Sequence, residues 1–412
     1  MTKTTLAIDF GTSNSATAIL VDGAVRRLQM EAGADTLPTA VFLPSDNGQM
    51  LIGRAAEAAL VAGEDGRYMR ALKSVLGTSL FHEPRQIAGK RIRLSEIVTA
   101  LLAQVKTRAE SEAGHPFTHV LSGRPVHFHS GNPARDAQAE TDLRACYEAA
   151  GFDEVAFLFE PEAAALATQD NSHDETRLIV DIGGGTSDFS VVRVQAGKTE
   201  VIASHGIRLG GTDFDQAVSM AYAMPLLGLG GELRRTLGDG LLPVPKAIFA
   251  DLASWPMIPF VYTPETSRAV ADLLRHAVDP RAIGRLAAVV EHRLGHDLAF
   301  AVERGKIAAN SGAPRARIDM CMIEPDLSAP LTPGRLNAAL APWRDTLRGA
   351  IYETLCLAQT PPAQIGAVVL VGGSSLMTLI GDEARAVCPS ARLIRSDAFT
   401  AVVDGLARAT GL

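Results

Sequence analysis

Leu6-Ala7-Ile8-Asp9-Phe10-Gly11-Thr12-Ser13-Asn14-Ser15 is a short apolar run that ends in an acid and a glycine-containing turn. A second apolar run, residues 16–20, follows it and stops at Asp22-Gly23, a pair that favours the tight turn of a β-hairpin. We therefore predict that the chain opens with a strand, a polar turn and a returning strand.

The same pattern returns later in the chain. An apolar run at 178–180 leads into Asp181-Ile182-Gly183-Gly184-Gly185-Thr186-Ser187-Asp188, and the next strand is predicted at 189–194. A repeat over so long a distance is not a solenoid, so it indicates two similar lobes.

Strands and helices alternate around these hairpins. Residues 95–114 have an apolar helical face with Ser95 as a possible cap, and Glu160-Pro161 can open a later helix with proline in its first turn. Further elements are predicted as strands at 119–122, 155–159, 367–371 and 392–394, and as helices at 137–150 and 400–409. The alternation indicates an α/β protein, and residues 216–318 are expected to be a largely helical insertion.

Composition argues against several classes of partner. The chain has 412 residues, a net charge of -7 and no basic run, so nucleic acid is not an expected partner. No apolar run approaches the roughly 20 residues of a membrane span, and residues 6–8 are too short for a signal peptide. The four cysteines are widely spaced, as expected for reduced thiols in a cytoplasmic protein.

The two Asp-Gly turns suit a polyphosphate. Glycine lets the backbone approach a ligand and present its N–H groups, and Thr12, Ser13 and Thr186 add hydroxyl donors. Asp9 and Asp181, each ending a strand, are suitable ligands for Mg²⁺. The prediction of a nucleotide site gains support from two further glycine pairs, in Leu209-Gly210-Gly211-Thr212-Asp213 and in Gly372-Gly373-Ser374.

In order and spacing, these motifs resemble those of a known family. The segments at 7–15, 160–166, 181–188, 209–215 and 369–374 are similar to the phosphate-1, connect-1, phosphate-2 and adenosine motifs of DnaK-type (seventy-kilodalton heat-shock) chaperones. The resemblance covers nearly the whole chain. It implies a two-lobed actin-like ATPase fold, with ribonuclease H-like duplicated domains and a largely helical insertion in the second lobe. Residues 123–128 and 241–259 look like the YegD-like subgroup.

The resemblance also implies roles in ATP hydrolysis. Lys73 matches the family's catalytic lysine, Glu160 and Asp181 would orient the attacking water, and Thr186 would contact the γ-phosphate. Asp9 and Asp181 would hold Mg²⁺ through water. The residues expected to bind ATP or ADP are Gly11, Thr12, Ser13, Asn14, Gly183, Gly184, Gly185, Thr186, Gly210, Gly211, Thr212, Glu303, Lys306, Asn310, Gly372, Gly373 and Ser374.

The adenosine side departs from the family pattern. Glu303, Lys306 and Asn310 fall on one face of a predicted helix that would bracket the ribose and adenine. The family's base-stacking arginine, the arginine beside the lysine, the serine of the helix and a late acid are replaced by Leu376, Ile307, Asn310 and Phe399. We therefore expect altered packing of the adenine.

Two other features are less typical of the family or of a metal site. Pro125 matches the family's switch proline, but Glu140 lies near the place of its partner arginine. His292 and His296 are four residues apart on a predicted helix without a third ligand. We interpret them as solvated helix histidines rather than zinc ligands.

We expect lobe I at residues 1–172, with the C-terminal helix at 398–412 packing back on it, and lobe II at 173–397 with the insertion at about 216–318. The chain ends at Leu412 after the last predicted helix, so a peptide-binding domain is expected to be missing. The favoured function is a slow Mg-dependent ATPase, chaperone-like, whose nucleotide state gates an unidentified protein partner or client. A nucleotide-gated module that hydrolyses nothing stays open, as do, with less support, a small-molecule kinase and a filament-forming protein of the same superfold.

Overall fold

The computed structural model describes residues 4–46, 48–129, 132–167, 174–195, 198–236, 238–395 and 400–411. The chain forms two compact units. Unit 1 contains Met1–Arg208, Leu347–Leu376 and Ile380–Leu412, and unit 2 contains Leu209–Thr346 and Met377–Leu379. Both predicted phosphate turns therefore lie in unit 1, whereas the glycine pair at 210–211 lies in unit 2.

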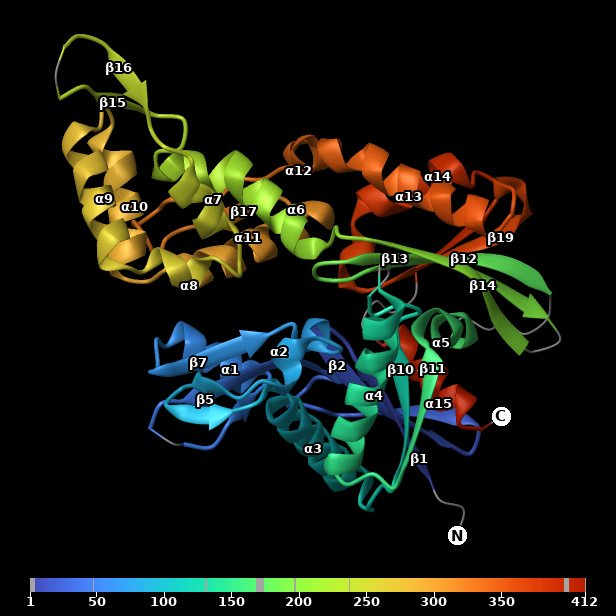
Figure 1. The fold of residues 1–412 in the computed structure, drawn as a ribbon. Coiled ribbons are helices and arrows are strands. Elements are labelled where there is room, and N and C mark those ends of the chain that lie inside the picture. Colours follow the sequence, from blue (N-terminus) through green and yellow to red (C-terminus); the bar gives the residue numbers. More distant parts are fainter. Residues whose placement is uncertain are drawn as a thin grey trace. The chain divides into compact units, whose positions relative to one another are not determined.

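Unit 1 is built on two sheets, which are visible in Figure 1. The strands of the first sheet are β1 (Thr5–Phe10), β2 (Asn14–Val21), β3 (Ala24–Leu28), β4 (Thr36–Pro38), β10 (His119–Arg124) and β11 (Glu154–Phe159). The strands of the second sheet are β12 (Glu175–Ile182), β13 (Ser187–Gln195), β14 (Lys198–Ile207), β19 (Ile365–Val371) and β20 (Arg392–Arg395).

The two sheets have the same topology. Their strand orders are β3-β2-β1-β10-β11, with β4 paired to β2, and β14-β13-β12-β19-β20. In the first sheet, β1 pairs antiparallel with β2 and β2 pairs antiparallel with β3, while β10 pairs with β1 in parallel. In the second sheet, β12, β13 and β14 are likewise antiparallel in succession, and β19 pairs with β12 in parallel. This repeat confirms the duplicated α/β architecture that the two Asp-Gly patterns predict.

The other elements of unit 1 surround these sheets. Its smaller strands are β5 (Ala40–Pro44), β6 (Leu51–Ile52), β7 (Gly66–Arg70), β8 (Arg85–Ile87) and β9 (Lys90–Ile92). Its helices, two of which begin in unit 2, are α1 (Arg54–Val61), α2 (Ser79–His82), α3 (Leu94–Ala113), α4 (Pro133–Ala149), α5 (Glu160–Ala167), α13 (Arg344–Leu357), α14 (Thr378–Val387) and α15 (Ala401–Ala409), with short 3₁₀ helices η1 (Leu72–Val75), η5 (Pro362–Gln364) and η6 (Gly373–Leu376).

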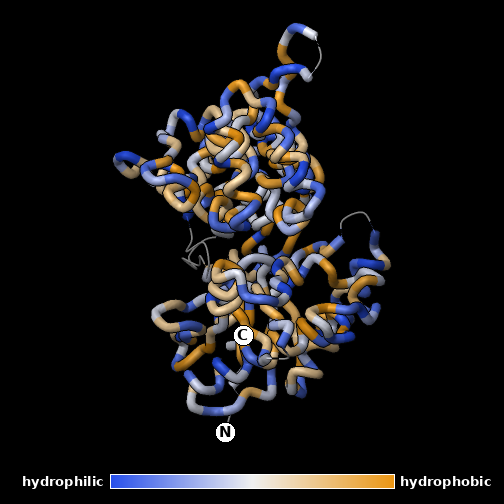
Figure 2. The backbone as a smooth tube through the Cα atoms, turned by 90° about the vertical axis from the view of Figure 1, so that its left-hand side faces the viewer, coloured by the Kyte–Doolittle hydropathy of each residue, from blue (hydrophilic) through white to orange (hydrophobic). Residues whose placement is uncertain are grey.

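The core of unit 1 follows the predicted apolar faces. The face of α3 formed by residues 97, 98, 101, 102 and 105 is fully buried in one cluster with β1. A second cluster contains the alanines of α5 and the apolar face of α15 together with strands of both sheets. A Cβ at Gly405 of α15 would lie 1.7 Å from the carbonyl oxygen of Ala163, so only glycine permits this close approach of α15 to α5. Hydrophobic segments gather inside the fold in Figure 2, and hydrophilic ones lie mostly in outer loops.

Unit 2 is mainly helical, and the expected insertion at about 216–318 in a second lobe stays a prediction. Its helices are α6 (Gly211–Val218), the π helix η2 (Ser219–Ala223), η3 (Met224–Leu227), α7 (Ala247–Ala253), α8 (Ile258–Val261), α9 (Pro264–His276), α10 (Pro280–Glu291), α11 (Gly295–Asn310), α12 (Pro333–Leu340) and η4 (Ala341–Trp343). Its strands form two short hairpins, β15 (Glu232–Arg234) with β16 (Leu241–Pro243) and β17 (Arg317–Asp319) with β18 (Ser328–Pro330).

Three local predictions need correction. Helix α3 begins at Leu94 after Arg93, so Ser95 lies inside the helix and caps nothing. Helix α4 begins four residues before the predicted start because the Asn132 side chain caps it and Pro133 takes the first position. His292 and His296 lie in different elements, since α10 ends at Glu291 and α11 starts at Gly295. His292 is exposed, but His296 is buried with its ring 4.9 Å from that of Trp255, so only His292 is the solvated histidine we expected.

Candidate functional site

Both predicted phosphate turns are tight. Between β1 and β2, a Cβ at Gly11 would lie 2.3 Å from the carbonyl oxygen of Asn14, so the close approach requires glycine. Between β12 and β13, the N–H of Gly183 donates to the carbonyl oxygen of Thr186 at 2.9 Å. Each strand therefore reverses within a few residues of its aspartate, which is Asp9 in β1 and Asp181 in β12.

Three of the glycine turns meet in unit 1. A Cβ at Gly184 would lie 2.5 Å from Ser13 Oγ, which puts the two phosphate turns side by side. Gly372 directly follows β19, the parallel neighbour of β12. Its φ is +81°, and a Cβ there would lie 2.5 Å from Asp181 Oδ1. The structure thus brings the turns around Ser13, Gly184 and Gly372 to the aspartate of β12, with no room for larger side chains at the two glycines.

Lys73 and Glu160 form an ion pair in the same unit. The Lys73 Nζ atom donates to Glu160 Oε1 at 2.5 Å, and the two side chains are only 10% and 14% exposed. Lys73 lies in η1, and Glu160 is the first residue of α5. Burial opposes the charge on Lys73, but the carboxylates of Glu160, Asp9 and Asp181 outweigh it and raise the pKa of the lysine. Lys73 is therefore a cation held among carboxylates.

Three aspartates of this site are difficult to ionise. Burial, followed by repulsion from Glu160, raises the pKa of Asp9 to about 7. The same two causes raise the pKa of Asp188 to about 7. Burial and then Glu160, Asp188 and Asp9 raise the pKa of Asp181 well above its usual value. One ammonium is not enough to balance this group of carboxylates.

The donor set fits a magnesium-bound polyphosphate. Mg²⁺ prefers oxygen ligands, uses few carboxylates and keeps several waters, and a divalent cation would balance the excess negative charge around Lys73. Within the described residues, no group of three or more His, Cys, Asp or Glu side chains is arranged to hold a metal by itself. Asp9 and Asp181 with water thus remain the predicted magnesium ligands.

A cavity lies next to the ion pair. Glu160, Asp181 and Asp188 form its polar wall, together with Ser190 and Ser204. The remaining lining residues are Pro125, Val126, Pro161, Ala164, Ile179 and Val371. The cavity therefore joins the carboxylates to the end of β10, where Pro125 follows the strand.

Asp188 is the site residue that the sequence reasoning did not assign. It lies directly opposite Asp181 in the β12–β13 ladder, so the two side chains extend to the same face of the sheet. A signal was available, because pairing residues outward from the Gly183–Thr186 turn places position 188 opposite position 181.

The predicted adenosine residues of unit 2 lie in unlike environments. Glu303 is exposed. Lys306 is buried, with its Nζ 2.8 Å from Asp215 Oδ1 and 3.4 Å from the Gly211 carbonyl oxygen. Asn310 accepts hydrogen bonds from the backbone N–H and the hydroxyl of Thr378. Lys306 thus joins α11 to the start of α6, and the role of all three in nucleotide binding stays a prediction.

Comparison with known proteins identifies the family. A model of the family described as Hsp70 protein matches residues 5–224, which is more than half of the chain. The chain belongs to the Hsp70 family. This membership confirms the predicted actin-like ATPase fold, while the YegD-like subgroup stays a prediction.

Two relatives illustrate the extent of the likeness. The chaperone protein DnaK of Metamycoplasma hominis is 31% identical over 217 residues, which are 52% of this chain and 34% of that protein. The chaperone protein DnaK of Cenarchaeum symbiosum (strain A) is 24% identical over 414 residues, covering 99% of this chain and 54% of the relative. The chain thus spans at most about half the length of these Hsp70 proteins.

Two of the predicted departures from the Hsp70 pattern are exposed side chains, Leu376 at 37% and Ile307 at 57%. Phe399 lies outside the described residues. Within the described part of the chain, no helix combines the length and hydrophobicity needed to cross a membrane.

Proposed function

We propose that this Hsp70-family chain binds ATP or ADP with magnesium at the unit 1 turns and slowly hydrolyses ATP. The observation that carries the proposal is the buried Lys73–Glu160 pair among Asp9, Asp181 and Asp188. Within the described residues, the Lys73 ammonium faces an excess of carboxylates in the free protein. It becomes well balanced when phosphates and a divalent cation are added together.

The residues would act mainly by positioning and charge. The Lys73 ammonium would stabilise the transferring phosphoryl group, and Glu160 with Asp181 would orient the attacking water. Bound Mg²⁺, held by Asp9 and Asp181 through water, would neutralise charge on the phosphate oxygens. Tight turns at Gly11 and Gly184 support the close approach of backbone N–H groups to phosphate.

Phosphate release from ATP tests the hydrolysis. We expect Lys73→Ala and Asp181→Asn to lower the rate by about 10²-fold or more, the effect of one lost transition-state contact. Lys106→Ala is the matched control, because Lys106 pairs with Glu110 at 2.7 Å and is 16% exposed, yet lies in α3. Equal rates in wild type and both site variants would contradict the assignment.

Phosphate release, combined with calorimetry, distinguishes the proposed ATPase from a second candidate function. Exposed Leu376 and Ile307 at the expected base side favour a weak or altered nucleotide site, which suits a nucleotide-gated module without hydrolysis. Calorimetric binding of Mg-ATP without any phosphate release would support that module. Absence of binding of both nucleotides at millimolar concentration would contradict both functions.

We also propose that the nucleotide state controls binding of a protein partner. A ligand shifts a conformational equilibrium only by its different affinities for the two states, and the coupling is reciprocal. A partner that tightens ATP binding must therefore itself be bound more tightly in ATP, by the same factor. Titration of each ligand in the presence of the other measures that factor.

A further inference from the structure

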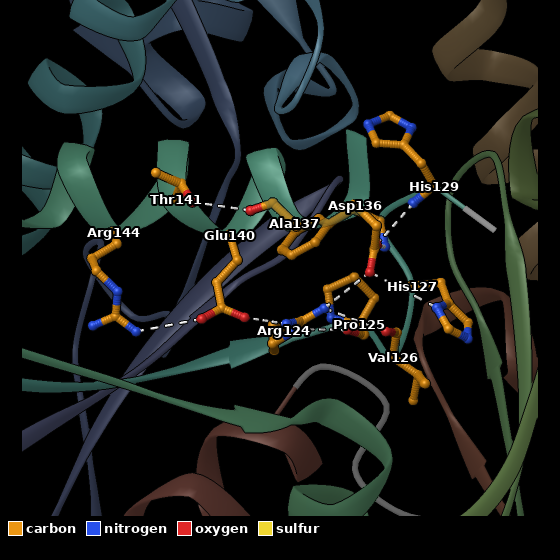
Figure 3. A network of polar contacts seen from close by, with 11 residues as sticks. Arg124, Pro125, Val126, His127, His129, Asp136, Ala137, Glu140, Thr141 and Arg144 are labelled. Carbon is orange, nitrogen blue, oxygen red and sulfur yellow. Dashed lines mark hydrogen bonds and ion pairs between the residues drawn. The ribbon is translucent and has the colours of Figure 1, made fainter. Parts of the chain in front are cut away.

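Arg124, the last residue of β10, is held by partners on several sides (Figure 3). Its side chain is 13% exposed and forms ion pairs with Glu140 and, at 3.6 Å, with Asp136, both on α4. The same guanidinium donates to the carbonyl oxygens of Pro125 at 3.1 Å and Val126 at 3.3 Å. Since Pro125 and Val126 line the cavity beside Glu160, Arg124 connects α4 to the wall of the candidate site.

Arg124 also contacts the residue next to Glu160. Its guanidinium lies over the rings of Phe128 and Phe159, 5.2 Å from each ring centroid. Phe159 is the last residue of β11, is paired with Arg124 in the β10–β11 ladder, and directly precedes Glu160. A planar, forked cation stacked on a ring and bound to carboxylates is a rigid connection that a lysine cannot reproduce.

The same helix and the segment before it also hold the chain that follows Lys73. Asp142 of α4 accepts a hydrogen bond from the N–H of Gly77 at 2.9 Å. The Nε2 atom of His129 donates to the carbonyl oxygen of Leu76 at 2.7 Å. Leu76 and Gly77 come directly after η1, which carries Lys73. Helix α4 is thus bonded to the chain that follows Lys73 and, through Arg124, is connected to the residue that precedes Glu160.

We propose that Arg124 is a positioning residue that fixes α4 against the end of β11, so that Lys73 and Glu160 are held in register for catalysis. The inference rests on the proposed ATPase function only for its kinetic consequence. Glu140, which lies near the place expected for a partner arginine of Pro125, is the acid that anchors Arg124. In these ion pairs, strand β10 therefore supplies the cation and helix α4 supplies the carboxylates.

Arg144 offers a matched control. It lies on α4, forms an ion pair with the same Glu140 at 3.4 Å, and donates to the carbonyl oxygen of Val155. Its guanidinium lies 4.9 Å from the ring centroid of Phe157 in β11. Arg144→Gln therefore removes contacts of the same three kinds between α4 and β11, an ion pair, a bond to a backbone carbonyl and a ring contact, but not those next to Glu160.

Arg124→Gln is expected to fold. The Glu140 carboxylate keeps its ion pair with Arg144 in this variant, and Asp136 keeps the backbone N–H donors of Phe128 and His129. Arg124→Lys is the second variant, which retains the charge. We expect it to resemble Arg124→Gln, because lysine lacks the forked geometry. Full wild-type behaviour of Arg124→Lys would overturn the proposal.

The first measurement needs no nucleotide. Competitive acetylation followed by mass spectrometry gives the reactivity of Lys73 relative to that of Lys106 in the same molecule. We expect this ratio to rise by at least about threefold in Arg124→Gln, because a loosened ion pair opens more often. It should stay at the wild-type value in Arg144→Gln. An unchanged ratio in Arg124→Gln, or an equal rise in both variants, would overturn the positioning role.

The second measurement separates kcat from nucleotide affinity. Arg124→Gln should lower kcat for phosphate release by about tenfold with less than about a twofold change in Kd for Mg-ATP, as expected for misplaced catalytic groups. Equal loss of kcat in Arg144→Gln would reduce Arg124 to a structural role. If wild type releases no phosphate, the hydrolysis proposal fails, and the Lys73 reactivity alone then decides whether Arg124 positions the pair.

Discussion

Replacement of Asp188 by asparagine should stabilise the nucleotide-free protein. Burial and the charge of Glu160 raise the pKa of Asp188 from 3.8 to about 7, so its ionised form is disfavoured in the folded state. Each unit of pKa corresponds to about 1.4 kcal/mol, so ionised Asp188 costs between about 2 and 4 kcal/mol, the lower value allowing for solvent that reaches the side chain. Asparagine has nearly the same shape and carries no charge.

The effect depends on pH in a defined direction. Between the unfolded pKa of 3.8 and the folded pKa of about 7, the folded protein binds the proton and the unfolded chain does not. The stability contributed by Asp188 is therefore complete below the unfolded pKa and falls as pH rises through this window. Asp188→Asn lacks this loss, so its advantage over wild type should be clearly smaller at pH 5 than at pH 8.

Urea unfolding at pH 5 and pH 8, without magnesium or nucleotide, measures the difference. Asp142→Asn is the control, for which we expect a decrease rather than an increase in the free energy of unfolding. The buried Asp142 carboxylate accepts from the Gly77 N–H, from Gln138 Nε2 at 2.7 Å and from His82 at 3.0 Å. Its loss should destabilise the protein by about 1–3 kcal/mol. The reasoning is refuted if Asp188→Asn is no more stable than wild type at pH 8, or if its advantage does not grow between the two pH values.

Two predictions concern ligand binding. In Gly184→Ala the added methyl would lie 2.5 Å from Ser13 Oγ, so ATP affinity should fall by about tenfold or more. The control is Gly349→Ala in α13, where the added methyl would meet nothing within 4 Å, and it should bind ATP like wild type in calorimetry. Burial and then Glu160 raise the pKa of Asp9 to about 7, so Mg-ATP binding, which needs the carboxylate, should weaken by roughly tenfold from pH 8 to pH 6 and release protons near neutral pH. Titrations in two buffers of different ionisation enthalpy would detect the protons, and an affinity independent of pH would contradict the role of Asp9.

Patterns within a few residues were readable from the sequence. The apolar runs ending at Asp9 and Asp181 are strands β1 and β12, and the following glycines make tight turns. The apolar face of α3 and the left-handed Gly114 that ends it were also predictable, because side-chain periodicity and positive φ are local properties. The starts of α3 and α4 were mispredicted because several neighbouring residues can each act as the cap, and the local pattern does not select one of them.

Contacts across long stretches of chain needed the tertiary structure. Without the family resemblance, nothing in the sequence joins Lys73 to Glu160, or Lys306 to Asp215. Arg124 and Glu140 are only 16 residues apart in the sequence. The proposed positioning role of Arg124 nevertheless depends on its contact with Phe159, which the β10–β11 ladder places beside it.

The sequence by itself therefore determined the duplicated α/β design and the residue types of the phosphate turns, because these follow from hydrophobic period and glycine geometry. Only the tertiary structure decided which charges are buried together. The pKa of Asp9 and of Asp188 rises because the fold removes water from them and sets Glu160 beside them. Desolvation and Coulomb interaction depend on three-dimensional distance, which the spacing of residues along the chain does not specify.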